Sequence, residues 1–139
     1  MSFREKIDWL SLGAILIGFG WYFAAFPYAS KGNAALGTQG GMLFAIAILM
    51  AITMTISAVA LAVHKPSEAN ASVDERDRNI GRMAATRAYY VMIPGAAFAF
   101  ASAFYTRELV IVLNMLLAAS VLAECVRLSS QIFASQRGY

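Results

Sequence analysis

A continuous stretch of the chain, Gly32 to Val63, contains no charged residue. Three further uncharged stretches run from Trp9 to Ser30, from Ala88 to Thr106 and from Leu109 to Ala123. An α-helix rises about 1.5 Å per residue, so a helix of about 20 apolar residues crosses the roughly 30 Å hydrocarbon core of a bilayer. The four stretches therefore predict four transmembrane helices.

The composition favours a membrane protein over a water-soluble domain. Of the 139 residues, 60% are hydrophobic and 14% are charged, and the mean hydropathy is +0.62. Soluble domains carry about 25% charged residues. We therefore predict an all-α fold, an integral membrane four-helix bundle in which residues 1–139 form a single transmembrane domain.

The uncharged stretches also predict where the helices begin and end. We expect helices at about 9–30, 42–63, 73–105 and 109–128, with a cytoplasmic linker at 64–72. The second helix is expected to begin only at Met42, because residues 32–41 are rich in glycine, which is unfavourable within helices. The fourth helix is expected to continue past Glu124, because its uncharged stretch alone is short for a membrane span.

The basic residues predict the orientation of these helices. An even number of helices places both termini and the 64–72 linker on the same side of the membrane. Nine basic residues fall on that side, and two fall in the opposite loops: Arg4, Lys6, Lys65, Arg76, Arg78, Arg82, Arg87, Arg127 and Arg137, against Lys31 and Arg107. Cytoplasmic loops carry the excess of lysine and arginine. We therefore expect a multi-pass protein of the bacterial cytoplasmic (inner) membrane with both termini in the cytoplasm.

The linker ends in a motif that is typical of helix N-termini. Ser72-Val73-Asp74-Glu75 has the S-x-x-E form of a capping box, in which the serine caps the helix and the glutamate bonds back to the serine amide. No strong helix breaker follows before Pro94. We predict one helix over about 73–105 that starts in the cytoplasm, enters the membrane and bends at most near Pro94.

The start of this predicted helix carries the most informative motif. The string DERDRNIGRMAATRAYYV, from Asp74 to Val91, resembles the signature of domain of unknown function 2178, a family of small four-helix bacterial membrane proteins. The resemblance implies a D-E-R-D-x-x-I stretch that leads into the third transmembrane helix, and it implies no reaction. Asn79 and Gly81 stand where the family pattern favours apolar or acidic helix formers.

The charges of this motif have three interpretations. They can cap a solvated helix, pair along it and anchor it at the lipid headgroups. They can also form a docking surface for a cytoplasmic protein partner or for a second copy in a homo-oligomer. A carboxylate metal site is the third interpretation, but helical spacing spreads the acids around the axis and the arginines compete for them, so we predict no metal site. The candidate interaction residues are Asp74, Glu75, Arg76, Asp77, Arg78, Arg82, Arg87 and Glu124.

Glu124 is the charged residue that comes closest to the middle of a predicted span. If the third and fourth helices form a hairpin, Glu124 lies about one turn from the level of Arg87. We predict an ion pair of Glu124 with Arg87 or with Arg127. The alternative is a proton-transfer or substrate carboxylate, because ionisable groups within membranes are costly and usually functional. Asn114 is expected to make a hydrogen bond between helices.

Several kinds of chemistry lack their usual residues. Cys125 is the single cysteine and His64 the single histidine, so one chain cannot build a cysteine metal cluster or a bis-histidine haem site. Common hydrolase, nucleotide-binding and zinc-protease motifs do not occur. We expect no enzymatic activity, no cofactor and no nucleic-acid partner. The sequence favours an accessory, regulatory or immunity-type factor acting through residues 72–90; the alternative is a homo-oligomeric small transporter or channel that uses Glu124.

Overall fold

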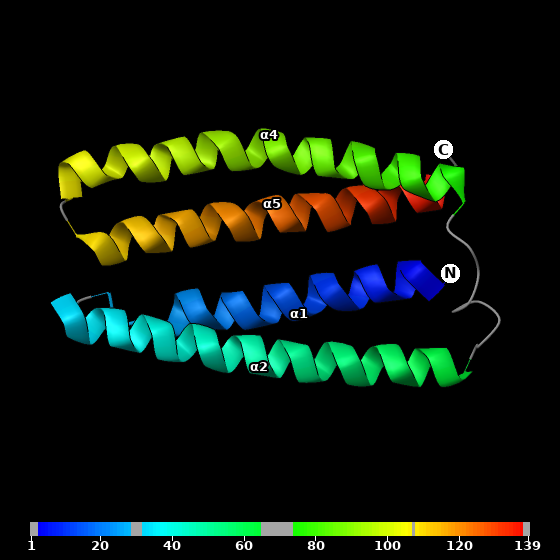
Figure 1. Ribbon diagram of the computed structural model, residues 1–139, viewed down its shortest axis with the longest axis horizontal. Helices are drawn as coiled ribbons and strands as arrows, with labels where there is room; N and C mark the ends of the chain where they lie inside the picture. The colour runs from blue at the N-terminus through cyan, green and yellow to red at the C-terminus, as the bar shows by residue number, and fades with distance from the viewer. Residues whose placement is uncertain (1–2, 29–31, 65–73, 107, 138–139) are drawn as a thin grey trace.

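The computed structural model describes residues 3–28, 32–64, 74–106 and 108–137. These residues form four helices, α1 (Phe3–Ala25), α2 (Gly32–His64), α4 (Glu75–Thr106) and α5 (Leu109–Arg137). The helices lie side by side in the spatial order α4, α5, α1, α2 and alternate in direction (Figure 1). No strand occurs within these four ranges, and the predicted all-α four-helix bundle is confirmed.

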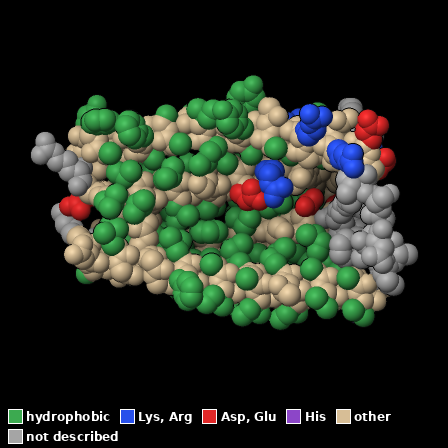
Figure 2. Space-filling model, in the orientation of Figure 1, with side chains coloured by type: hydrophobic (Ala, Val, Ile, Leu, Met, Phe, Trp, Pro, Cys, Tyr) green, Lys and Arg blue, Asp and Glu red, His purple; other side chains and the backbone are tan. Residues whose placement is uncertain are grey.

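Each of the four helices is long and apolar enough to cross a membrane. Large hydrophobic side chains cover much of the outer surface, as expected where lipid is the solvent (Figure 2). The chain is therefore a multi-pass membrane protein. We call the end of the bundle where α1 and α4 begin and α2 and α5 end the termini end. The opposite end, where α1 and α4 end and α2 and α5 begin, is the hairpin end.

The start of α2 corrects the sequence prediction. The glycine content of residues 32–41 predicts a loop and a helix from Met42, but α2 begins at Gly32. Gly32 has a φ of +66°, a left-handed conformation that glycine adopts without strain. In lipid an unpaired backbone N–H or C=O costs several kcal/mol, whereas a helical glycine costs about 1 kcal/mol relative to alanine. The helical hydrogen bonds therefore outweigh the low propensity of the glycines.

Three other helix ends also differ from the prediction. α1 begins at Phe3 instead of residue 9 and ends at Ala25 instead of residue 30. α5 continues to Arg137 instead of residue 128. A charged residue marks where the lipid ends but does not end a helix, because its head group can reach water while the backbone stays helical. Pro27 explains the early end of α1, since the residue before a proline disfavours the helical conformation.

The predicted long helix over about 73–105 is confirmed as α4, which runs unbroken through Pro94. The predicted capping serine, Ser72, lies outside the described residues, as does most of the predicted linker at 64–72. Asp74 caps the described helix. Its Oδ1 accepts a hydrogen bond from the Glu75 amide at 2.7 Å, and its carbonyl accepts one from the Arg78 amide at 3.1 Å.

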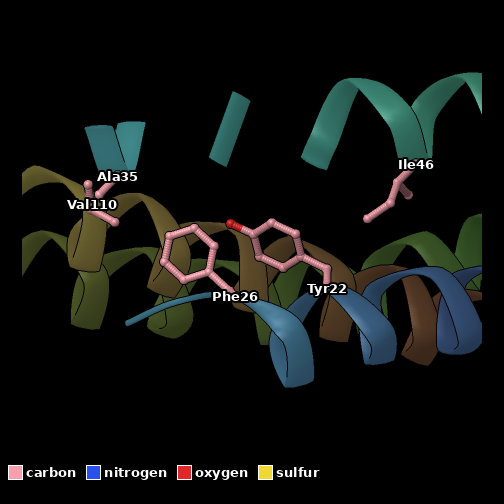
Figure 3. Packing of buried hydrophobic residues seen from close by; sticks show 5 residues of the cluster. All are labelled: Tyr22, Phe26, Ala35, Ile46 and Val110. Atoms are coloured by element: carbon pink, nitrogen blue, oxygen red, sulfur yellow. The ribbon is translucent and has the colours of Figure 1, made fainter. Parts of the chain in front are cut away.

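Two packed regions hold the bundle together. In the first, Tyr22 of α1 and Phe26, which directly follows α1, lie between α2 and α5, against Ala35 and Ile46 of α2 and Val110 of α5 (Figure 3). The two rings stack with centroids 5.5 Å apart. The second region is the long contact between α4 and α5. The buried residues of α4, which are Ile80, Ala84, Ala99 and Ser102, lie in this contact, and Gly95 of α4 lies against Ala119 of α5.

Candidate interaction surface

The first four turns of α4 carry a charged surface on a helix that packs along its neighbour α5. We call residues 74–87 the α4 charged segment. Seven of the predicted interaction residues are exposed on it: Asp74, Glu75, Arg76, Asp77, Arg78, Arg82 and Arg87. Ile80 and Ala84 of the same segment are buried. The segment therefore has one apolar face that packs on α5, while its charged side chains point away from the packed face.

Acids and bases are ordered along the α4 charged segment. Its three carboxylates, Asp74, Glu75 and Asp77, lie at or before the first turn, where the helix dipole favours negative charge. Arg76 lies among these acids, and Arg78, Arg82 and Arg87 follow them. Arg78 stands four residues after Asp74, a spacing that favours an acid–base pair on a helix surface. Within the part of the chain that the structure describes, no three potential metal ligands come together.

Glu124, the eighth predicted residue, lies apart from this segment on α5. Its predicted contact is confirmed with Arg127 of the same helix. Arg127 Nε donates to Glu124 Oε2 at 2.9 Å, and Arg127 Nη2 donates to Oε1. Arg127 Nη1 also donates to Gln131 Oε1 at 3.3 Å. The alternative partner, Arg87, is exposed on α4, so the ion pair lies along one helix and does not clamp α4 to α5.

Two acids of α1 interact with polar residues of α5, and the sequence analysis missed both. Asp8 interacts electrostatically with Arg127. Glu5 is buried, and its Oε1 accepts a hydrogen bond from Gln136 Nε2 at 3.2 Å. Figure 2 shows charged side chains surrounded by hydrophobic ones on this face. We call this group the polar seam; it comprises Glu5, Asp8, Glu124, Arg127, Gln131 and Gln136. Its sequence signal is the spacing of Glu124, Arg127 and Gln131 along one helix face.

A second polar group lies in the half of the bundle towards the hairpin end. The Tyr22 hydroxyl donates to Asn114 Oδ1 at 2.7 Å, and Asn114 Nδ2 donates to the Val110 carbonyl at 2.8 Å. The predicted interhelical hydrogen bond of Asn114 is therefore confirmed. Gln39 of α2 lies within hydrogen-bonding reach of the same hydroxyl. The sequence analysis missed Gln39 because it falls in the stretch predicted as a loop.

Hollows open on the sides of the described bundle, and one of them lies beside the second polar group. The α2–α5 groove has a volume of about 400 Å³ and lies beside Gln39. Its lining residues are Leu36, Gln39, Gly40, Leu43, Leu113, Leu116, Leu117 and Ser120. A second hollow of about 460 Å³ lies between α1 and α2, next to the exposed Trp21, and its lining is almost entirely apolar.

The fold and its apolar surface define a small all-α, multi-pass membrane protein. Comparison with protein-family models, curated proteins and solved structures gives no match for this chain. The resemblance to domain of unknown function 2178 therefore stays a prediction that rests on the motif from Asp74 to Val91.

Proposed function

We propose that this protein is a non-enzymatic membrane protein that acts as an accessory, regulatory or immunity-type factor by binding a cytoplasmic protein through residues 72–90. The observation that carries the proposal is the α4 charged segment, whose seven charged side chains are exposed while Ile80 and Ala84 hold it on α5. A surface held in this way loses little conformational freedom when a partner binds.

The length of α4 supports a location of this segment outside the hydrocarbon. The helix has 32 residues and is therefore about 48 Å long, about 18 Å more than the hydrocarbon core. That excess corresponds to about 12 residues, close to the length of the α4 charged segment. Tyr89 and Tyr90 follow it and are exposed, as expected for tyrosines at the headgroup level. A partner at the membrane surface would contact both the charges and these rings.

The position of α4 leaves this surface accessible. α4 packs along α5 and, among the described helices, makes no comparable contact with α1 or α2. The excess of basic residues at the termini end supports a cytoplasmic location for that end, in a bacterial inner membrane. Arginine and tyrosine are enriched in protein interfaces, which favours a protein partner over simple solvation of the segment.

Site-specific photo-crosslinking in the native membrane tests this proposal. Met83 is exposed on the α4 charged segment, and Phe98 is exposed farther along the same helix. A photoreactive amino acid at position 83 of the full chain is expected to give a discrete protein adduct, whereas the same amino acid at position 98 is expected to give lipid adducts.

Charge reversal distinguishes a docking surface from a solvated headgroup anchor. Arg78→Glu with Arg82→Glu is expected to abolish the adduct at position 83, because a complementary acidic surface would be repelled. Arg78→Lys with Arg82→Lys is the matched control, since it keeps the charge and the exposure. Lipid adducts alone at position 83, or an adduct that survives charge reversal, would contradict the proposal.

A transporter or channel that uses Glu124 is the second candidate function. The polar seam favours it, because Glu124 and Asp8 place two acids close to one guanidinium within helices long enough to span the membrane. Proton-dependent flux in vesicles containing the purified protein tests this function. Flux that Glu124→Gln abolishes without lowering the melting temperature would favour transport over the docking function.

A further inference from the structure

One polar atom of Gln39, a residue that lines the α2–α5 groove, lacks a hydrogen-bond partner within the described structure. Gln39 is 5% exposed, and its Oε1 has no hydrogen-bond partner in the described structure. The Tyr22 hydroxyl has one hydrogen, which it donates to Asn114, so towards Gln39 it can only accept. Of the Gln39 amide, only the N–H can therefore donate to the Tyr22 hydroxyl. The Gln39 carbonyl oxygen is left as an unused acceptor in a residue that lines the groove.

The Gln39 carbonyl oxygen can therefore take a hydrogen bond from a donor that does not belong to the chain. Buried polar groups in native proteins almost always have a partner, and an unsatisfied one is costly in lipid, where little water is present. Phospholipid acyl chains could fill the groove, but they have no hydrogen-bond donor. The occupant that satisfies both the apolar lining and Gln39 Oε1 has an apolar body and a donor group.

We propose that the α2–α5 groove binds an amphiphile with an apolar chain and a free hydroxyl, and that the buried Gln39 amide turns towards the groove so that Oε1 accepts a hydrogen bond from this hydroxyl. Gln39 lies in the second turn of α2, near the hairpin end, where an amphiphile in a bilayer keeps its polar group. The apolar lining continues along α5 to Ser120, towards the middle of the bundle. The hydroxyl and the chain would therefore occupy the groove in the orientation that they have in the bilayer.

Photolabelling of the full chain in phosphatidylcholine nanodiscs tests this site. The probe is a long-chain alcohol with a diazirine in its chain, and its methyl ether is the comparison, because the ether accepts but cannot donate. We expect the alcohol to label peptides of the groove about fivefold more than the ether, which corresponds to one hydrogen bond.

Three variants identify the residues responsible. Gln39→Leu removes the acceptor and is expected to reduce labelling by the alcohol to the level of the ether. Gly40→Leu places a side chain in the groove and is expected to reduce labelling by both probes. Gly37→Leu is the matched control: a Cβ at Gly40 or at Gly37 meets nothing within 4 Å, and Gly37 does not line the groove. Gly37→Leu should leave both labelling levels unchanged.

The alternative occupants give different results. Equal labelling by alcohol and ether means that acyl chains fill the groove without recognition, and it would overturn the proposal. So would an alcohol preference that persists in Gln39→Leu. A second copy in the groove would appear as loss of an oligomer in Gly40→Leu with unchanged labelling, which also refutes the proposal. The groove lies away from the α4 charged segment, so these outcomes are independent of the test for a cytoplasmic partner.

Discussion

Gly95 sets the distance between α4 and α5 at one point of their contact. A Cβ atom at this position would lie 2.6 Å from the Ala119 Cβ and 3.5 Å from the Ala119 Cα. The first distance is far shorter than van der Waals contact, and neither Ala119 atom belongs to a flexible side-chain end. The sequence predicts a bend at most near Pro94, whereas the structure gives the adjacent Gly95 a packing role, as for other small residues between membrane helices.

Gly95→Ala should therefore destabilise the protein by about 1 to 3 kcal/mol, because α4 and α5 must separate to admit the methyl group. Thermal unfolding of the purified protein in detergent measures this effect. Gly13→Ala on α1 is the control, since a Cβ at Gly13 meets nothing within 4 Å and the change should be close to neutral. Equal melting temperatures for the two variants would show that the contact with Ala119 relaxes without cost.

The polar seam predicts an asymmetry between Glu124 and Arg127. Glu124→Gln removes one acid, but Arg127 keeps Gln131 and Asp8 as partners. Arg127→Leu instead leaves Glu124 and Asp8 without their guanidinium. Both side chains of the pair are more than a third exposed, which reduces the energies for a fully buried pair. We expect losses of about 1 kcal/mol for Glu124→Gln and about 2 to 3 kcal/mol for Arg127→Leu.

Urea titration of the two variants, reconstituted in the same detergent, measures this difference. A double variant, Glu124→Gln with Arg127→Gln, serves as the control, because it removes the pair without leaving a lone charge at either position. It should be more stable than Arg127→Leu. A greater loss from Glu124→Gln than from Arg127→Leu would mean that Asp8 does not depend on Arg127.

The sequence predicts single residues well where their partners lie on the same helix. The contact of Glu124 with Arg127 follows from a spacing of three residues. The involvement of Asp8 and Gln39 does not, because it depends on how α1 and α2 are aligned lengthwise against α5. That alignment is determined by packing, in particular by Tyr22 and Phe26 in the core, and no local pattern encodes it.

The helices themselves are well predicted, and their ends are not. Four uncharged stretches predict four helices because an uncharged backbone in lipid must pair its own polar groups. The same stretches predict α5 too short and place the start of α1 too late in the sequence. Both helices continue through charged residues into the headgroup region. Glycine content misplaces the start of α2, because propensities measured in water underestimate the value of backbone pairing in lipid.

The cap of α4 gives a prediction for a whole element. Asp74→Ala removes the acceptor of the Glu75 amide and should cost about 1 kcal/mol, confined to the first turns of the helix. Hydrogen exchange in nanodiscs should show faster exchange in residues 75–80 and no change beyond Pro94. Asp74→Asn, which keeps a side-chain oxygen, should exchange like the original chain. Faster exchange along all of α4 would indicate that the cap supports the entire contact with α5.

At the scale of the whole molecule, the four helices differ in how much of their surface is enclosed. α1 and α5 occupy the middle of the layer, α2 contacts both of them, and α4 contacts chiefly α5 (Figure 1). α4 therefore has one main neighbour among the described helices, and it is also the helix that carries the charged segment. α4 thus combines a membrane span with the surface proposed for a partner, while the α2–α5 groove lies between α5 and α2.

Because α1 and α4 begin at the end of the bundle where α2 and α5 end, the structure predicts which residues lie on the same side of the membrane. On a background with Cys125→Ser, single cysteines at Asn33 and Thr106 mark the hairpin end, and those at His64 and Gln136 mark the termini end. Because basic residues concentrate at the termini end, an impermeant maleimide added to intact bacterial cells should label only positions 33 and 106.

Inside-out vesicles should give the reverse pattern, with labelling at positions 64 and 136 alone, and this comparison controls for the reactivity of each cysteine. The two outcomes that would contradict the prediction differ in meaning. Labelling of all four positions from one side would contradict the membrane-spanning arrangement itself. Labelling of positions 64 and 136 in intact cells would keep four spans but place the α4 charged segment on the outer side of the membrane, because α4 begins at the same end of the bundle at which α2 and α5 end. A cytoplasmic partner would then be impossible, so the orientation of the bundle decides whether the proposed docking function can operate.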